Sequence, residues 1–240
     1  MAEPIQARAT QTQVVVNTFI RSVYNWMAVG LTLTGVIAFY VAGVVENMMQ
    51  TNPAALRSIQ PIFFVLIIAE LGLVFYLSAR IQKIEATTAT ALFIIYAMLN
   101  GVTLSFIFIA YTAASIASTF FVCAATFGAC SVYGMVTKKD LTSVGQFMFM
   151  GLIGIIIASV VNIFLRSPAM NMIISYIGVF VFVGLTAYDT QKLKHMALTQ
   201  PEGLDPAVAR KGAIMGALTL YLDFINMFLF LLRILGTSRD

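Results

Sequence analysis

Seven long apolar runs constrain this chain more than any other feature of its sequence. A membrane-spanning helix needs about 20 consecutive apolar residues, and only 10% of the residues are charged, against about a quarter in soluble domains. We therefore predict an all-α integral membrane protein with seven transmembrane helices. The predicted spans are residues 22–45, 61–79, 88–110, 112–136, 145–165, 170–190 and 212–235.

The placement of lysine and arginine predicts how the chain crosses the membrane, because cytoplasmic loops carry an excess of these residues. Ten basic residues fall on one side and four on the other, which predicts a cytoplasmic N-terminus and a C-terminus outside. Residues 1–21 are then a polar cytoplasmic segment and residues 22–240 one seven-helix bundle. The ten are Arg8, Arg21, Arg80, Lys83, Lys138, Lys139, Lys192, Lys194, Arg210 and Lys211, and the four are Arg57, Arg166, Arg233 and Arg239.

Motifs for a cofactor, a nucleotide or a structural metal are not found in the sequence. Cys123 and Cys130 lie on one predicted span, too far apart along a helix for a disulfide, and His195 is the single histidine. The basic residues are dispersed among short loops, so nucleic acid is not an expected partner. We predict that the chain has no cofactor and is not an enzyme.

Three carboxylates stand inside predicted spans, where a charge costs at least about 2.5–3.5 kcal/mol. They are Glu70, Asp189 and Asp223. Asp223 lies about 18 Å from Lys211 along its helix, and Asp189 lies about 7.5 Å from Lys194. By spacing alone the two aspartates differ in depth by some 10 Å. They can meet only if the seventh helix begins below the interface or the sixth continues beyond it.

If Asp189 and Asp223 meet, their chemistry follows from their proximity. Two carboxylates in one desolvated site cannot comfortably both ionise, so the pair retains one proton. When ionised, it offers hard oxygen ligands suited to Ca²⁺, and Asn226 could supply another oxygen from the same helix face. Arg80 is predicted at a depth similar to that of Asp189, so it is either an ion-pair partner or a basic residue that flanks the span.

Two stretches of the C-terminal half, GLTAYDTQKLKHM and LTLYLDFINMFLFLLRILG, resemble the Bax inhibitor-1 family, and in particular its bacterial members. The resemblance implies a seven-helix bundle with the seventh helix central, in a multi-pass inner (cytoplasmic) membrane protein. It also implies a pH-sensitive Ca²⁺ leak with a proton-sharing pair, carried here by Asp189 and Asp223.

The resemblance assigns Glu70 to a position near the pore and Arg80 to a latch on Asp189. The family pattern spaces the glutamate and the arginine one residue further apart than this chain does, which is a turn of about 100° on a helix. The latch role of Arg80 therefore stays open.

The function predicted from these features is a pH-sensitive calcium leak channel or transporter, with the lipid bilayer and calcium ions as its partners. A regulatory protein that binds other membrane proteins, such as a membrane protease, is an alternative. An intramembrane aspartyl protease is a weaker one, because TLYLDF lacks the GxGD sequence of presenilin-like proteases.

Overall fold

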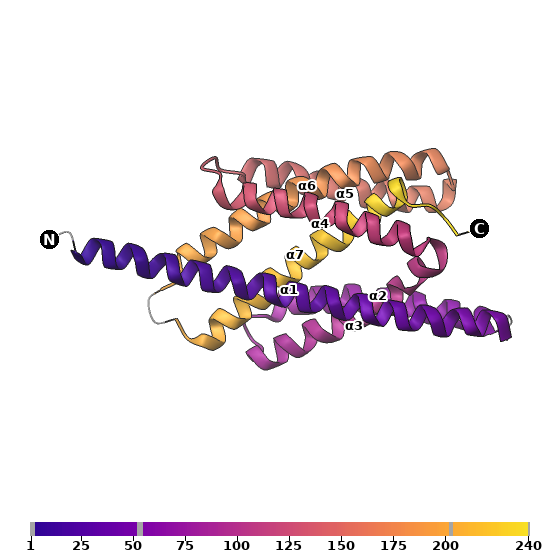
Figure 1. Ribbon diagram of the computed structural model, residues 1–240, viewed down its shortest axis with the longest axis horizontal. Helices are drawn as coiled ribbons and strands as arrows, with labels where there is room; N and C mark the ends of the chain where they lie inside the picture. The colour runs from indigo at the N-terminus through magenta and orange to yellow at the C-terminus, as the bar shows by residue number, and fades with distance from the viewer. Residues whose placement is uncertain (1–2, 52–54, 202–203, 240) are drawn as a thin grey trace. The chain divides into compact units, whose positions relative to one another are not determined.

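The structure is a computed structural model that describes residues 3–51, 55–201 and 204–239, without the side chains of residues 3–13 and 55–60, so Arg8 and Arg57 lie outside the described side chains. Within these ranges seven helices are long and apolar enough to cross a membrane, which confirms the predicted all-α integral membrane fold. The helices are α1 (Glu3–Thr51), α2 (Ala55–Arg80), α3 (Ala86–Ala110), α4 (Ala113–Val136), α5 (Thr142–Leu165), α6 (Pro168–Leu198) and α7 (Pro206–Leu235) (Figure 1).

The helices extend beyond the predicted apolar runs, most clearly in α1, α6 and α7. Helix α6 continues to Leu198 rather than ending near residue 190, and α7 begins at Pro206 rather than near residue 212. Backbone hydrogen bonds hold a helix whatever its side chains, so polar residues prolong it where an apolar run ends. Helix α1 is likewise continuous from Glu3 into the first span, and the assignment of residues 1–21 as a polar cytoplasmic segment stays a prediction.

The chain divides into two compact units, and α1 and α7 each contribute residues to both. The first unit contains residues 113–200 and 219–237 together with the start of α1. The second contains residues 18–112 and 201–218 and the C-terminal tail. The prediction of one bundle from residue 22 onward is not tested by this division.

In the first unit α6 packs against both α4 and α5, the helices labelled together with it in Figure 1. Glycines permit the close approach. A Cβ atom at Gly134 of α4 would overlap the carbonyl oxygen of Ala187, and one at Gly145 of α5 would overlap the ring of Tyr188. Both contacts are made on the stretch of α6 that also carries Asp189, so the backbone around that aspartate is held from two sides.

A short turn joins α5 to α6 and sets these two helices side by side. Arg166 takes the left-handed conformation at φ 51°, and the Ser167 side chain accepts a hydrogen bond from the Met170 N–H as the N-cap of α6. The buried amide of Asn162 donates to the Ser167 carbonyl at 3.2 Å and accepts from the Ser167 N–H at 3.0 Å. Together with Pro168 in the first turn, these bonds define where α6 begins.

The second half of α7 is anchored in the first unit by aromatic contacts. The ring of Phe224 lies 5.5 Å from that of Phe120 and 5.5 Å from that of Phe127, and the Cys123 thiol donates to the Phe224 carbonyl at 3.6 Å. In the most apolar window of α7, 67% of the residues are buried, against 11–39% in the other spans. The predicted central position of α7 in the bundle stays a prediction.

In the second unit polar contacts join α1, α2, α3 and the start of α7. The Thr34 hydroxyl of α1 donates to the Ala97 carbonyl of α3 at 2.8 Å, and Lys211 of α7 donates to the Gln82 carbonyl, just past the end of α2, at 3.2 Å. The Arg210 guanidinium lies 5.7 Å from the centre of the Trp26 ring. The start of α7 therefore lies beside the end of α2, as an up-and-down path requires.

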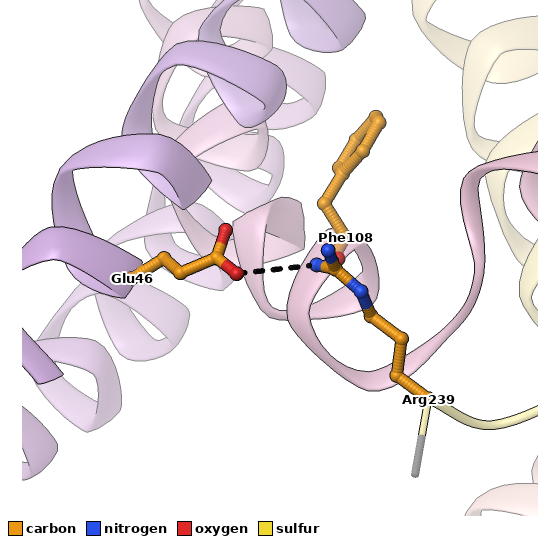
Figure 2. A network of polar contacts seen from close by, with 3 residues as sticks. All are labelled: Glu46, Phe108 and Arg239. Carbon is orange, nitrogen blue, oxygen red and sulfur yellow. Dashed lines mark hydrogen bonds and ion pairs between the residues drawn. The ribbon is translucent and has the colours of Figure 1, made fainter. Parts of the chain in front are cut away.

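The C-terminal tail lies beside the ends of α1 and α3 (Figure 2). One guanidinium nitrogen of Arg239 is 3.6 Å from a Glu46 carboxylate oxygen and donates to the Phe108 carbonyl at 3.2 Å. The backbone N–H of Arg239 donates to the Ala110 carbonyl at 3.0 Å. The tail and the ends of α1 and α3 thus share one end of this unit, which is again what an up-and-down path requires.

Candidate functional site

The first unit brings Asp189 of α6 and Asp223 of α7 together. Their carboxyl groups are within hydrogen-bonding range of each other. One of the two conditions set by the sequence spacing is met, because α6 continues through Lys192 and Lys194 to Leu198. The depth difference of about 10 Å rested on treating Lys194 as the end of the span, and the helix does not end there.

The two carboxyls differ in burial and share a need for a hydrogen-bond donor. Asp223 is 4% exposed, whereas Asp189 is half-buried. Among the described residues no donor reaches the Oδ2 atom of Asp223, and an ionised carboxylate can only accept. A single proton held between Asp189 and Asp223 would supply the missing donor. The geometry is therefore suited to a pair that carries one proton.

A cavity of about 630 Å³ opens at this pair and is lined from α5, α6 and α7. Asn226, one turn after Asp223, also lines it, and its predicted role as an oxygen ligand stays a prediction. The Asn226 amide nitrogen donates to the Leu222 carbonyl at 2.8 Å, so the amide oxygen is the group that it can offer to a cation. The α5 wall is largely apolar, with Phe149, Leu152 and Ile156 facing the cavity.

Glu70 belongs to a polar cluster of the second unit. It is buried, and it accepts hydrogen bonds from the Thr103 hydroxyl at 2.9 Å and from the Asn100 amide at 3.3 Å. These bonds join α2 to α3. Its predicted location near a pore stays a prediction.

Arg80 is the exposed last residue of α2. Its carbonyl accepts from the backbone N–H groups of Lys83 and Ile84, which closes the helix end. The described residues include no ion pair of its guanidinium. Arg80 and Asp189 belong to different units, and the latch between them stays a prediction.

Sequence reasoning missed Lys192 and Tyr188 as residues of this site. Both line the cavity together with Asp189. Lys192 follows Asp189 by three residues, a spacing that puts two side chains on one helix face, and this signal was present in the sequence. Because Lys192 flanks an apolar run, its charge first indicates how the chain crosses the membrane, and its closeness to Asp189 is easily overlooked.

Seven apolar helices that carry a carboxylate pair in a cavity define a polytopic membrane protein with an acidic site among its helices. The chain belongs to the Bax inhibitor-1 family, since the model of that family, described as "Inhibitor of apoptosis-promoting Bax1", matches residues 16–240. This match confirms the resemblance predicted from the two C-terminal motifs.

Similar proteins occur in several bacteria. The inner membrane protein YbhL of Escherichia coli K12 is 53% identical over 231 residues, 95% of each chain. An uncharacterized protein of Deinococcus radiodurans is 47% identical over 225 residues, 94% of this chain and 92% of its own. An uncharacterized protein of Borreliella burgdorferi is 44% identical over 230 residues, which are 96% of each of the two chains. The helices and the similarity to YbhL support a multi-pass inner-membrane location.

Proposed function

We propose that this protein is a passive, pH-sensitive calcium leak channel whose gate is the pair Asp189 and Asp223. The observation that carries the proposal is the buried Asp223 Oδ2 atom, which has no donor among the described residues and lies next to a second carboxyl in a cavity. An unsatisfied buried polar atom is costly. A carboxylate oxygen without a donor is nevertheless expected at a site that binds and releases a proton.

At low pH one proton bridges the two carboxyls and the gate is closed. The shared proton removes one negative charge and gives Asp223 its hydrogen bond. The bond also joins α6 to α7 at this point. With a single remaining charge the site has little attraction for a divalent cation.

At higher pH the proton leaves, and both carboxylates are ionised. They repel each other in a site where charges are poorly screened, so the contact between α6 and α7 loosens. The carboxylates and the Asn226 oxygen then offer hard ligands to Ca²⁺. Calcium takes six to eight oxygen ligands, so most of its shell would be water, and weak binding of this kind favours passage over storage.

The test is Ca²⁺ flux into proteoliposomes over a range of pH. Asp223→Asn keeps the size of the side chain but can neither ionise nor share a titrating proton. We expect flux that is lower at high pH and no longer rises with pH. Glu85→Gln is the matched control, an exposed carboxyl exchanged for its amide at the N-cap of α3, and should behave as wild type. Unchanged flux and unchanged pH dependence in Asp223→Asn would exclude the mechanism.

The proposal also distinguishes this protein from an enzyme. A conduit needs no catalytic step, so membrane peptides should stay intact in the presence of wild-type protein. Cleavage that disappears in Asp189→Asn would instead favour the aspartyl protease alternative. Wild-type protein that passes no Ca²⁺ at any pH would favour the regulatory alternative, and cross-linking in native membranes would then identify the bound membrane protein.

A further inference from the structure

A second cavity of the first unit, of about 660 Å³, lies between the α4–α5 loop and the last turns of α6. Its lining is strongly basic. Four lysines and one histidine contribute to it, against one carboxylate, that of Asp140. The basic residues are Lys138, Lys139, Lys192, Lys194 and His195.

The single carboxylate in this cavity is already engaged. Asp140 Oδ1 accepts hydrogen bonds from the Thr142 backbone N–H at 2.9 Å and from the Thr142 hydroxyl at 2.6 Å. The carboxylate thus serves the start of α5. Lys138, Lys139 and Lys192 are exposed, and no ion pair of theirs occurs in the part of the chain that the structure describes. Positive charge therefore predominates in the cavity.

The walls of the cavity are fixed by hydrogen bonds between the loop and α6. The side chain of Gln191, which is 5% exposed, donates to the Lys139 carbonyl at 2.8 Å and accepts from the Leu141 N–H at 2.9 Å. The Lys194 ammonium donates to the Met135 carbonyl at 2.6 Å. Because the loop backbone is held in place, little order has to be created when an anion binds.

The loop joins the ends of two membrane-spanning helices, so it lies where the membrane meets water. Lipid phosphates lie at that level, and lysines near an anionic surface are attracted to it. We propose that this cavity binds a phosphate group through Lys138, Lys139 and Lys192. The phosphate is either that of an anionic phospholipid headgroup or free inorganic phosphate, since both present negatively charged phosphate oxygens to the three ammonium groups.

Two residues connect this cavity with the aspartate pair, because Lys192 and Tyr188 line both cavities. A bound phosphate would draw the Lys192 ammonium toward itself and away from Asp189. Phosphate occupancy should therefore change the charge balance at the gate. This consequence rests on the proposed function, whereas phosphate binding itself does not, and the two are tested separately.

The binding test uses the purified full-length chain in phosphatidylcholine nanodiscs and a fluorescent short-chain phosphatidylglycerol. Each lysine near a lipid surface contributes about fivefold to binding. The variant Lys138→Gln, Lys139→Gln, Lys192→Gln should then bind the probe about 100-fold more weakly. Lys194 is left in place because it holds the loop to Met135.

The control removes equal charge elsewhere, by Arg21→Gln, Arg80→Gln and Lys83→Gln, whose side chains are exposed, and should bind as wild type. Equal binding by the triple variant and wild type, or an equal loss in the control, would overturn the proposal. If the triple variant does not fold, the single variants Lys138→Gln and Lys139→Gln should each lose about fivefold, and no loss in either also overturns it.

Competition identifies the source of the phosphate. Displacement of the probe by inorganic phosphate assigns the site to free phosphate, and displacement only by unlabelled phosphatidylglycerol assigns it to a lipid headgroup. Displacement by a diacylglycerol of the same chain length, which carries no phosphate, would show that the acyl chains alone bind, which contradicts the proposal. Calcium flux does not enter this measurement, so a failure of the proposed function would leave it unaffected.

Discussion

Glu70 and Asp223 are both buried carboxyls on membrane-spanning helices, but their hydrogen bonding differs. Glu70 accepts from Thr103 and Asn100 of the neighbouring helix, whereas Asp223 has one oxygen without a donor among the described residues. Buried polar groups are nearly always hydrogen-bonded. Glu70 therefore has the features of a structural link between α2 and α3, and Asp223 those expected of the proton-sharing pair that we propose.

The link made by Glu70 predicts the effect of Thr103→Val, which removes the shorter hydrogen bond and keeps the side-chain shape. We expect a loss of about 1 kcal/mol in the free energy of unfolding, the usual size for a hydrogen bond between membrane helices. Denaturant titration in mixed micelles measures it. Thr126→Val is the control, because that hydroxyl donates to the Val122 carbonyl of its own helix. Equal stability of the two variants would contradict the structural role of Glu70.

Asp140 lies outside the membrane-spanning helices, and its environment predicts a dependence on pH. The Thr142 hydroxyl and then the Thr142 backbone N–H hold the pKa of this carboxyl below its usual value. A lowered pKa in the folded state stabilises the protein at neutral pH, and the effect disappears on acidification through that pKa.

Asp140→Asn cannot titrate, so it should be less stable than wild type at pH 7. The difference should begin to shrink near pH 4, the ordinary pKa of an aspartate, and should disappear only below the lowered pKa of the folded state. The effect is expected to be small because solvent screens an exposed group. Thermal unfolding of both proteins across this range measures it. A stability difference that does not vary with pH would show that the charge of Asp140 contributes nothing.

At the scale of helices, the sequence predicted the number and order of the spans but not all of their ends. Apolar runs report where lipid begins, whereas a helix ends where its backbone bonds end. For α6 the two differ by about two turns, because Gln191, Lys192 and the residues after them continue the helix to Leu198. This difference also decided the aspartate pair, which spacing alone left apart.

The basic cavity could not be predicted from the same sequence signals. In the sequence its lysines are basic residues of loops predicted to be cytoplasmic, a pattern that indicates topology and nothing about the distances between the lysines. The lysines lie close together because Gln191 fixes the α4–α5 loop. Its side-chain amide donates to the Lys139 carbonyl and accepts from the Leu141 N–H. A single uncharged glutamine at the end of an apolar run has no distinctive sequence signature, so only the folded geometry identifies it.

The close packing of α4 on α6 predicts opposite effects for two glycines of one helix. Gly134→Ala places a Cβ against the Ala187 carbonyl and 3.1 Å from the Thr190 Cβ, and should cost about 1–3 kcal/mol of stability. Gly128→Ala meets nothing within 4 Å and should be neutral or stabilising by up to about 1 kcal/mol. Unfolding in mixed micelles compares them. A Gly134→Ala protein as stable as Gly128→Ala would contradict the packing.

At the scale of the whole molecule, the contacts of the second unit and the charge count agree on an up-and-down path. Lys211 lies beside the end of α2, and Arg239 lies beside the ends of α1 and α3. The contacts relate helix ends to one another but do not say which end faces the cytoplasm. That assignment rests on the lysines and arginines alone.

The orientation is predicted by charge and is tested by labelling. In a background where Cys123 and Cys130 are replaced by alanine, Ser238→Cys should react with a membrane-impermeant maleimide in intact spheroplasts. Lys138→Cys should react only after the membrane is permeabilised. The reverse pattern would show that the C-terminus is cytoplasmic and that the charge bias does not determine the topology of this chain.

The bonds of Gln191 to the α4–α5 loop have a consequence for proteolysis. Lys138 and Lys139 form a dibasic pair in a short connection between helices, the sequence that a trypsin-like protease would select in an unfolded chain. Such an enzyme needs an extended backbone with accessible N–H and carbonyl groups, and here the Lys139 carbonyl and the Leu141 N–H are both occupied by Gln191. The folded loop is thus a poor protease substrate, and its cleavage would require prior separation of the loop from α6.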